Sequence, residues 1–580
     1  MLDGVVGDAV RALRGKDVAL VTRKEALAQL TAPGQPHEII EIEAIGRRVR
    51  VFRNAPKNLG EIYAATASDL PFLIYEDERL TFKETLRRSA TLAHALVEDY
   101  GVRKGDRVAI SMRNYPEWLI AFMAATSVGA LTVAMNALWT PDEMAYGLQN
   151  SAPKVLIADQ ERLDRLAAMA SPPKDLPVIA VRTTRPLPSG ARAWADIMSR
   201  PGRDQMPAVD VQPDDDAMML FTSGSTGNPK GAVSTHRNVI SALLSWELDL
   251  QAAFLTGLVE KPPEGSPQGA ALLGIPLFHV TGLLSVALSS FRLQRRVVSM
   301  YKWDVERGAD LIEKEGVTAF VGTPAITGDL VVYARATGRK FNTLASLGGG
   351  GAARAPEQVR AIDAVFEKAK PATGWGMTES NAIGVGIAAG DYLRKPESSG
   401  RVSAVLDIRI VDENGKPLPT GQRGELQIRG ASIMRGYWKR PDANAESFDG
   451  DWFRTGDVAY LDDEGFLFIV DRIKDLVIRG GENIGCGAVE YALQEHPLVA
   501  EACVYGVPDE RLGEEVAATL YTTGPVSDAE LRSFLEPRLA KYQIPRYFHM
   551  EREPLPRGAT GKIMKRDLRT EAAKRLAAKS

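Results

Sequence analysis

The chain has 580 residues, of which 45% are hydrophobic and 25% charged, and its formal net charge is −3. This length exceeds what one hydrophobic core usually organises, so at least two domains are expected. The small net charge offers no bulk attraction to nucleic acid or to an anionic membrane, which favours small-molecule chemistry.

The N-terminal part, residues 1–55, is a charged and mixed preamble to which we assign no chemistry. Within it, "HEIIEIEAIGRRVRVFR" at 37–53 predicts a pair of strands. Asp3 and Asp8 interrupt any apolar stretch at the start, so we predict no secretory signal. Only two cysteines occur, without metal-ligand spacing, which indicates a reducing compartment and a cytoplasmic protein.

One segment needs a membrane test, because residues 118–140, "WLIAFMAATSVGALTVAMNALWT", carry no charge and are long enough to span a bilayer. Ser127, Gly129 and Asn136 interrupt it. It divides naturally into a buried helix after Pro116 and a buried strand at 130–135. We therefore predict no integral membrane segment.

From 59 to about 457, short apolar runs such as "RVAISM" and "KVLIAD" alternate with amphipathic stretches, the pattern of layered α/β domains. Beyond residue 457, "YLDDEGFLFIVDRIKDLVIRGGENI" predicts a hairpin, a charged connection and another strand. The tail begins as a proline and glycine loop and ends as a basic helix. We predict an α/β protein with a large, multi-subdomain N-terminal domain of sheets and helices at 56–473 and a small α+β domain at 474–580.

A glycine-rich loop, "FTSGSTGNPKGA", occupies residues 221–232. Its glycines allow close approach of the backbone, and its hydroxyls and lysine supply several donors that would wrap a polyphosphate. It is not the usual nucleotide P-loop, because Pro229 precedes Lys230 and Gly231 follows it. Taken alone, the loop could also be a serine and glycine linker.

The loop resembles the phosphate-binding signature of the adenylate-forming superfamily, and further motifs follow in the family's order. They are "PLFHVTG" at 276–282, "GGGGAARAPE" at 348–357, "GWGMTES" at 374–380, "GELQIRG" at 424–430, "WFRTGD" at 452–457, "DRIKDLVIRGGENI" at 471–484 and "PRGATGKI" at 556–563. The resemblance runs from about residue 59 almost to the C-terminus. It implies that a carboxylate attacks the α-phosphorus of ATP, releasing pyrophosphate, and that a thiol then takes the acyl group from the acyl-adenylate.

The resemblance also implies how the nucleotide is bound. The phosphate-loop residues would be Thr222, Ser223, Gly224, Ser225, Thr226, Gly227 and Lys230, and the adenine-slot residues would be Gly350, Gly351, Ala352, Gly374, Trp375, Gly376 and Met377. Trp375, where the family usually has tyrosine, would stack on adenine. Thr378 would contact the α-phosphate, and Glu379 would bind Mg²⁺, an oxygen-seeking cation. Asp457 would accept from both ribose hydroxyls, with Arg472 near the same sugar.

For catalysis, the resemblance gives Lys562 the leading role, since a fixed cation beside the α-phosphate stabilises the transition state. His279 would border the carboxylate pocket, although a hydrogen-bonded core histidine is the alternative. Lys474 aligns with the family's hinge, which makes the C-terminal domain mobile. After rotation, Arg479, Gly480 and Gly481 would face the active site and bind CoA.

The segments expected around the acid are mainly small or aliphatic, so we expect an apolar pocket without a second charged group. A medium or long fatty acid is preferred, then a hydrophobic aryl or alicyclic acid. The expected protein is thus an AMP-forming acyl-CoA synthetase that uses Mg²⁺, ATP and CoA, and a homodimer is an open expectation. Alternatives are an acyl-AMP ligase that loads a carrier protein and a catalytically inactive nucleotide-binding protein. A P-loop kinase would instead release ADP.

Overall fold

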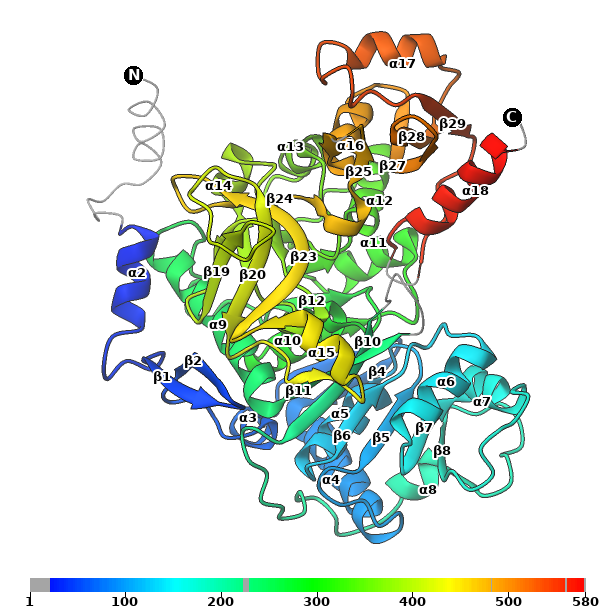
Figure 1. Ribbon diagram of the computed structural model, residues 1–580. Helices are drawn as coiled ribbons and strands as arrows, with labels where there is room; N and C mark the ends of the chain where they lie inside the picture. Colours follow the sequence, from blue (N-terminus) through cyan, green and yellow to red (C-terminus); the bar gives the residue numbers. More distant parts are fainter. Residues whose placement is uncertain (1–20, 223–228, 481, 559–560, 578–580) are drawn as a thin grey trace.

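The computed structural model describes residues 21–222, 229–480, 482–558 and 561–577 (Figure 1). Within these residues the strands form five sheets, with helices packed between and around them. Two large, mostly parallel sheets, one antiparallel sheet and a two-stranded hairpin make up the N-terminal part. A fifth sheet with its own helices forms a small C-terminal domain. The predicted α/β class, with a large N-terminal and a small C-terminal domain, is confirmed.

The first large sheet carries the phosphate-loop segment. Its strand order is β21-β11-β10-β6-β5-β7-β8-β9. The bounds are β5 Arg107–Ser111, β6 Leu131–Ala134, β7 Val155–Asp159, β8 Val178–Val181, β9 Ala191–Ala193, β10 Asp216–Thr222, β11 Lys230–Thr235 and β21 Gly436–Tyr437. The strands from β9 through β10 run parallel, whereas β10 and β11 form an antiparallel pair. The central strands are buried, as expected when helices cover both faces.

The second large sheet has the order β18-β17-β16-β15-β14-β12-β13-β3-β4. The bounds are β3 Pro71–Tyr75, β4 Glu78–Thr81, β12 Ala270–Leu273, β13 Arg296–Ser299, β14 Ala319–Gly322, β15 Ser346–Gly349, β16 Lys370–Trp375, β17 Val385–Ala388 and β18 Arg401–Val402. Because β14, β15 and β16 are parallel neighbours, their carboxyl ends meet at one edge. The "GGGG" and "GWG" motifs therefore lie side by side.

Helices connect and cover these sheets. The main ones are α3 Leu59–Ala65, α4 Phe82–Glu98, α5 Pro116–Ser127, α6 Pro141–Ser151, α7 Gln160–Ala167, α9 His236–Leu255, α11 Val305–Lys314, α12 Pro324–Thr337, α13 Pro356–Val365 and α14 Ala389–Arg394. Residues 118–140 do form a buried helix followed by a strand, α5 and β6, as predicted. Across the described residues, we find no helix with the length and apolarity that a bilayer span requires.

An antiparallel sheet holds the ribose motif and binds the N-terminal preamble. It comprises β19 Leu406–Val411, β20 Gly424–Gly430, β22 Phe448–Asp449, β23 Trp452–Leu461 and β24 Leu467–Arg472. The predicted strand pair at 37–53 is confirmed as the hairpin of β1 Ile39–Ala44 and β2 Arg47–Phe52. Arg47 donates to the carbonyls of Met434 and Arg435, at 3.0 and 2.9 Å, so this hairpin is anchored to the region after β20.

The small C-terminal domain has a separate apolar core. Its elements are β25 Val477–Arg479, β26 Glu482–Ile484, α16 Cys486–Gln494, β27 Val499–Asp509, β28 Gly513–Thr522, α17 Asp528–Leu535, β29 Tyr547–Glu551 and the terminal helix α18 Lys565–Ala577, shown in orange to red in Figure 1. The hairpin, charged connection and following strand predicted at 460–484 are confirmed as β23, β24, a short 3₁₀ turn at 473–475 and β25.

Candidate active site

The two ends of the phosphate loop are joined by the β10–β11 pair. Thr222 lies opposite Lys230, and its hydroxyl donates to the Lys230 carbonyl at 3.3 Å. The other predicted loop residues, Ser223, Gly224, Ser225, Thr226 and Gly227, lie outside the described residues. The Lys230 ammonium sits 4.5 Å from the centre of the Tyr437 ring, a cation–π contact.

Tyr437 connects this lysine to the predicted metal ligand. Its hydroxyl donates to Glu379 Oε1 at 2.6 Å, and Glu379 itself is buried in the short 3₁₀ helix η2, Thr378–Ser380. Burial, followed by the Glu379 charge, raises the pKa of Tyr437, so the hydroxyl keeps its proton. Sequence reasoning missed Tyr437, since a tyrosine in "RGYWKR" has no feature that separates it from a core aromatic.

The turn after Glu379 is fixed by a buried amide. Asn381 adopts a left-handed conformation, with φ of 58°, and its side-chain amide donates to Ser234 Oγ and to the Ser432 carbonyl. These bonds hold the turn to the first sheet.

Among the described residues, no group of three or more His, Cys, Asp or Glu side chains could hold a metal. A single buried carboxylate at Glu379 is still a fitting donor for Mg²⁺, which usually takes one or two carboxylates and completes its shell with phosphates and water.

The predicted ribose residues meet in one hydrogen-bonded group. Asp457 on β23 lies opposite Arg472 on β24, and the two form an ion pair with Arg472 Nε 3.0 Å from Asp457 Oδ1. The Trp375 indole N–H, from the end of β16, donates to Asp457 Oδ2 at 2.8 Å. Burial raises the pKa of Asp457, while Arg472 and the indole oppose that rise. The indole therefore engages the carboxylate, a contact the sequence did not predict.

The glycines of the adenine motifs fall into two groups. Gly350, Gly351 and Ala352 follow β15, and Gly351 has φ of 79°, which favours glycine. In "GWG", by contrast, the backbone itself requires glycine. A Cβ at Gly374 would lie 2.8 Å from the Val385 carbonyl oxygen, and one at Gly376 would lie 2.4 Å from that of Ala382. Met377 follows directly and its N–H donates to Ser380 Oγ.

Lys562 arrives from the C-terminal domain on a loop docked against the N-terminus of α12. A Cβ at the preceding Gly561 would lie 2.9 Å from Thr323 Oγ1, so the contact is close. Lys562 is exposed to solvent, although neighbouring protein desolvates part of its side chain. Desolvation, followed by repulsion from Arg472, lowers the pKa of Lys562, and the carboxylates of Asp475 and Asp457 oppose this.

His279 interacts electrostatically with Lys562. Burial, with a further contribution from Lys562, lowers the pKa of His279 to about 4, so the ring is neutral at physiological pH. Its Nδ1 accepts from the Thr281 N–H at 3.3 Å. The next residues form a π-helix, η1 Thr281–Leu288, a geometry that often marks functional sites. Gly282 is required here, because a Cβ would lie 2.3 Å from the Pro276 carbonyl oxygen.

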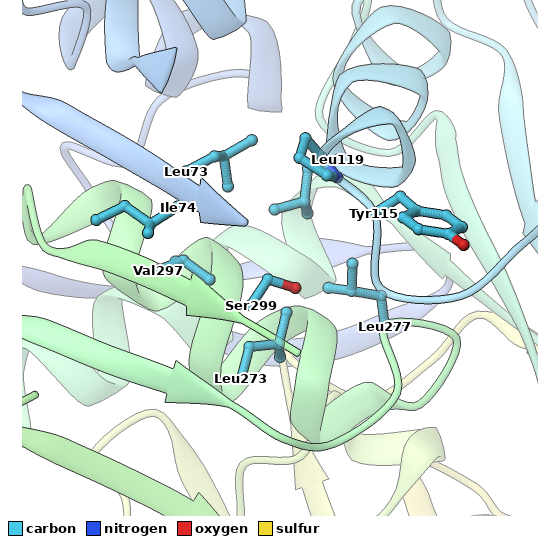
Figure 2. Close-up of a pocket in the computed structure, with 9 residues that line it drawn as sticks. Leu73, Ile74, Tyr115, Leu119, Leu273, Leu277, Val297 and Ser299 are labelled. Atoms are coloured by element: carbon cyan, nitrogen blue, oxygen red, sulfur yellow. The ribbon is translucent and has the colours of Figure 1, made fainter. Parts of the chain in front are cut away.

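Two cavities were found near this region. One, of about 340 Å³, lies beside the Lys562 loop and is lined by Arg113, Asn114, Leu138, Gly274, Pro276, Phe278, Tyr301, Lys302, Trp303, Ala325, Ile326, Asp329, Arg557, Gly558 and Gly561. The other is an apolar void of about 10 Å³ between β3, β12, β13 and α5, around which Figure 2 shows Leu73, Leu119, Leu273, Leu277 and Val297. This void has room for about one water molecule, so it cannot take an acyl chain.

The residues predicted to bind CoA and to form the hinge lie at the start of the C-terminal domain. Arg479 makes a bidentate ion pair with the buried Glu515, at 2.9 and 2.8 Å. Gly480 has φ of 57° and donates to the Leu512 carbonyl, whereas Gly481 lies outside the described residues. Lys474 is exposed in the 3₁₀ turn between β24 and β25. Arg479 thus has a partner within the domain in this arrangement.

Most of the chain is similar in sequence and structure to known proteins of one family. Residues 61–438 match the family model described as AMP-binding enzyme, and residues 488–562 match that of the AMP-binding enzyme C-terminal domain. The chain is 32% identical over 502 residues to the long-chain-fatty-acid–CoA ligase FadD13 of Mycobacterium tuberculosis, covering 85% of this chain and 93% of that protein. It is 34% identical over 493 residues to a feruloyl-CoA synthase of an Amycolatopsis species, covering 84% and 93%. The solved structure of o-succinylbenzoate CoA synthetase from Bacillus subtilis with ATP and magnesium superposes with a TM-score of 0.74 at 28% identity, covering 88% and 99%.

Proposed function

We propose that this chain, which belongs to the AMP-binding enzyme family and is an AMP-forming acid–thiol ligase, joins a hydrophobic carboxylic acid to CoA. The acid is first activated as an acyl-adenylate with release of pyrophosphate, and CoA then accepts the acyl group. The observation that carries this proposal is the docking of the Lys562 loop on α12, which brings a C-terminal cation to Asp457, Arg472 and His279 of the N-terminal part.

In the first half-reaction, we assign Lys562 to the α-phosphate and the reacting carboxylate, where negative charge develops. Thr222, Lys230 and Thr378 bind the phosphates, and Asp457 with Arg472 binds the ribose. Glu379 would hold Mg²⁺, which supplies charge neutralisation for the phosphates when bound. The neutral His279 borders the acid and orients it. With a pKa of about 4 it is a poor proton acceptor at neutral pH, so we do not assign it as a general base.

For the second half-reaction, we propose that the domain at 474–580 turns about Lys474. The rotation withdraws Lys562 and brings Arg479 and the neighbouring glycines toward CoA. The thiol needs mainly access and orientation, because it is intrinsically a strong nucleophile. Free CoA is the favoured acceptor over a carrier protein.

We further propose a cytoplasmic location, to which the two buried free thiols, Cys486 and Cys503, are suited. Homodimerisation stays a prediction.

For the acid, a medium or long fatty acid remains our first choice, in line with the similarity to a fatty-acid–CoA ligase. An aryl acid is the second candidate, because one relative of similar identity is a feruloyl-CoA synthase. Both candidates share an apolar body and a single carboxylate.

A pyrophosphate-release assay with Mg²⁺ and ATP tests the proposal across fatty, aryl and short acids. We expect release with at least one hydrophobic acid, AMP as the nucleotide product, and acyl-CoA when CoA is added. Turnover with a phosphopantetheinylated carrier but not with CoA would support the carrier-loading alternative. A protein that releases no pyrophosphate with any acid would contradict the proposed function.

A further inference from the structure

The Asp457 carboxylate is held from two directions by side chains on two other strands. Arg472 Nε lies 3.0 Å from Oδ1, and the Trp375 indole N–H donates to Oδ2 at 2.8 Å. Asp457 is only 3% exposed, so its charge depends on these partners. An anionic carboxylate offers about four lone-pair positions. Both oxygens therefore keep capacity to accept from a further pair of donors.

The sequence around Trp375 creates the space that this contact needs. A Cβ at Gly384 would lie 2.5 Å from the Trp375 carbonyl oxygen and 2.7 Å from Cε3 of its indole, so both the backbone and the ring of Trp375 pack directly over a glycine. Any side chain at residue 384 would displace the Trp375 backbone together with its ring. The backbone of Trp375 is held in register by its pairing with Val385 on β17. The indole is thus confined by its surroundings, and its N–H direction is set.

We propose that Trp375 is a positioning residue that acts through Asp457, fixing the carboxylate so that it accepts from the ribose diol and making the site select a ribonucleotide over a deoxynucleotide. This inference rests on the proposed function, in which Asp457 binds the ribose of ATP. It gives the tryptophan a role that stacking on adenine does not include. A purely stacking ring would stabilise ATP and its deoxy analogues equally, whereas a ring that orients Asp457 stabilises the nucleotide with both hydroxyls more.

The test compares the binding of ATP, 2′-deoxyATP and 3′-deoxyATP by calorimetry, in the presence of Mg²⁺ and without acid. The variants are Trp375→Phe, which keeps an aromatic ring and removes the N–H donor, and Gly384→Ala, which keeps the tryptophan but shifts its backbone and ring. The control is Trp452→Phe, at the first residue of β23, whose ring contacts the side chains of Arg409 and Arg429. Circular dichroism and thermal melts establish that each variant is folded.

We expect the wild-type protein to prefer ATP to at least one deoxy analogue. In Trp375→Phe and Gly384→Ala this preference should fall by about 3- to 10-fold, the range expected for losing one net hydrogen bond. Trp452→Phe should keep it. Equal losses for all three nucleotides, or a preference unchanged in both variants, would overturn the inference and leave the ligase activity standing. Wild-type protein that binds no nucleotide would overturn the proposed function as well, and equal wild-type binding of all three would remove the ribose role of Asp457.

Discussion

Replacing Lys562 with alanine separates the two half-reactions. The magnitude follows from where the lysine sits. At about 4 Å, a unit charge pair is worth about 1 kcal/mol in water but about 4 kcal/mol at the effective dielectric of a partly enclosed protein site. The docked Lys562 loop and a bound nucleotide would exclude water between the charges, which favours the larger figure. We therefore expect adenylate formation to slow by about 10²- to 10³-fold, the usual loss for one positioned transition-state donor.

The assay measures each half-reaction alone. Exchange of labelled pyrophosphate into ATP reports adenylate formation, and a synthetic acyl-adenylate supplied with CoA reports thiol transfer. Lys562→Ala should suppress the first and leave the second nearly unchanged. The matched control is Lys574→Ala, which removes the same charge from the exposed side of α18. An unchanged exchange rate, or equal losses in both half-reactions, would refute the placement of Lys562 at the α-phosphate.

Three further outcomes are expected. Tyr437→Phe removes the hydroxyl that donates to Glu379, so the Mg²⁺ concentration for half-maximal pyrophosphate release should rise by about 10-fold, and an unchanged titration would refute the link. Gly561→Ala forces a Cβ into a left-handed residue 2.9 Å from Thr323 Oγ1, so adenylation should slow by about 10-fold, while Gly558→Ala, whose Cβ meets its nearest neighbour at 3.8 Å, should not. Burial lowers the pKa of His236 from 6.5 to about 4, so the unfolded chain binds the proton first and the free energy of unfolding should fall by about 3 kcal/mol as the pH drops from 6.5 to 4. Urea melts across that range measure it, and a flat profile for the wild type would contradict the assignment.

Local patterns in the sequence were sufficient for several elements. The strand pair at 37–53, the helix and strand at 118–140 and the hairpin at 460–484 each carry their own periodicity, turn residues or helix start, so no distant contact is needed to specify them. The pairing of Asp457 with Arg472 follows from that last hairpin, since its register sets the two residues opposite each other. Both residues were predicted from the family resemblance, and the register of the hairpin explains their contact.

Contacts between separate sheets had no such local signal. Trp375 and Asp457 are 82 residues apart in the sequence, and Tyr437 and Glu379 are 58 apart. In each pair the two residues lie on elements that do not belong to one hairpin. The motif resemblance identified Trp375 as a ring for adenine, but the partner of its N–H depends on how β16 meets β23. The glycines of "GWG" were attributed to a nearby ligand, yet the carbonyls of Val385 and Ala382 are sufficient to require them.

The charge state of the site is the clearest property that only the assembled fold determines. The charged residues of the site come from a C-terminal loop, two strands and a 3₁₀ turn; they are Lys562, Arg472, Asp457 and Asp475. By residue type alone, each would be expected on the surface. Once the loop docks, desolvation and then repulsion from Arg472 lower the pKa of Lys562, while the carboxylates of Asp475 and Asp457 offset part of that fall. A bound polyphosphate would relieve the same repulsion. Docking of the lysine loop and binding of an anion therefore stabilise each other, and neither residue type nor spacing in the sequence carries that coupling.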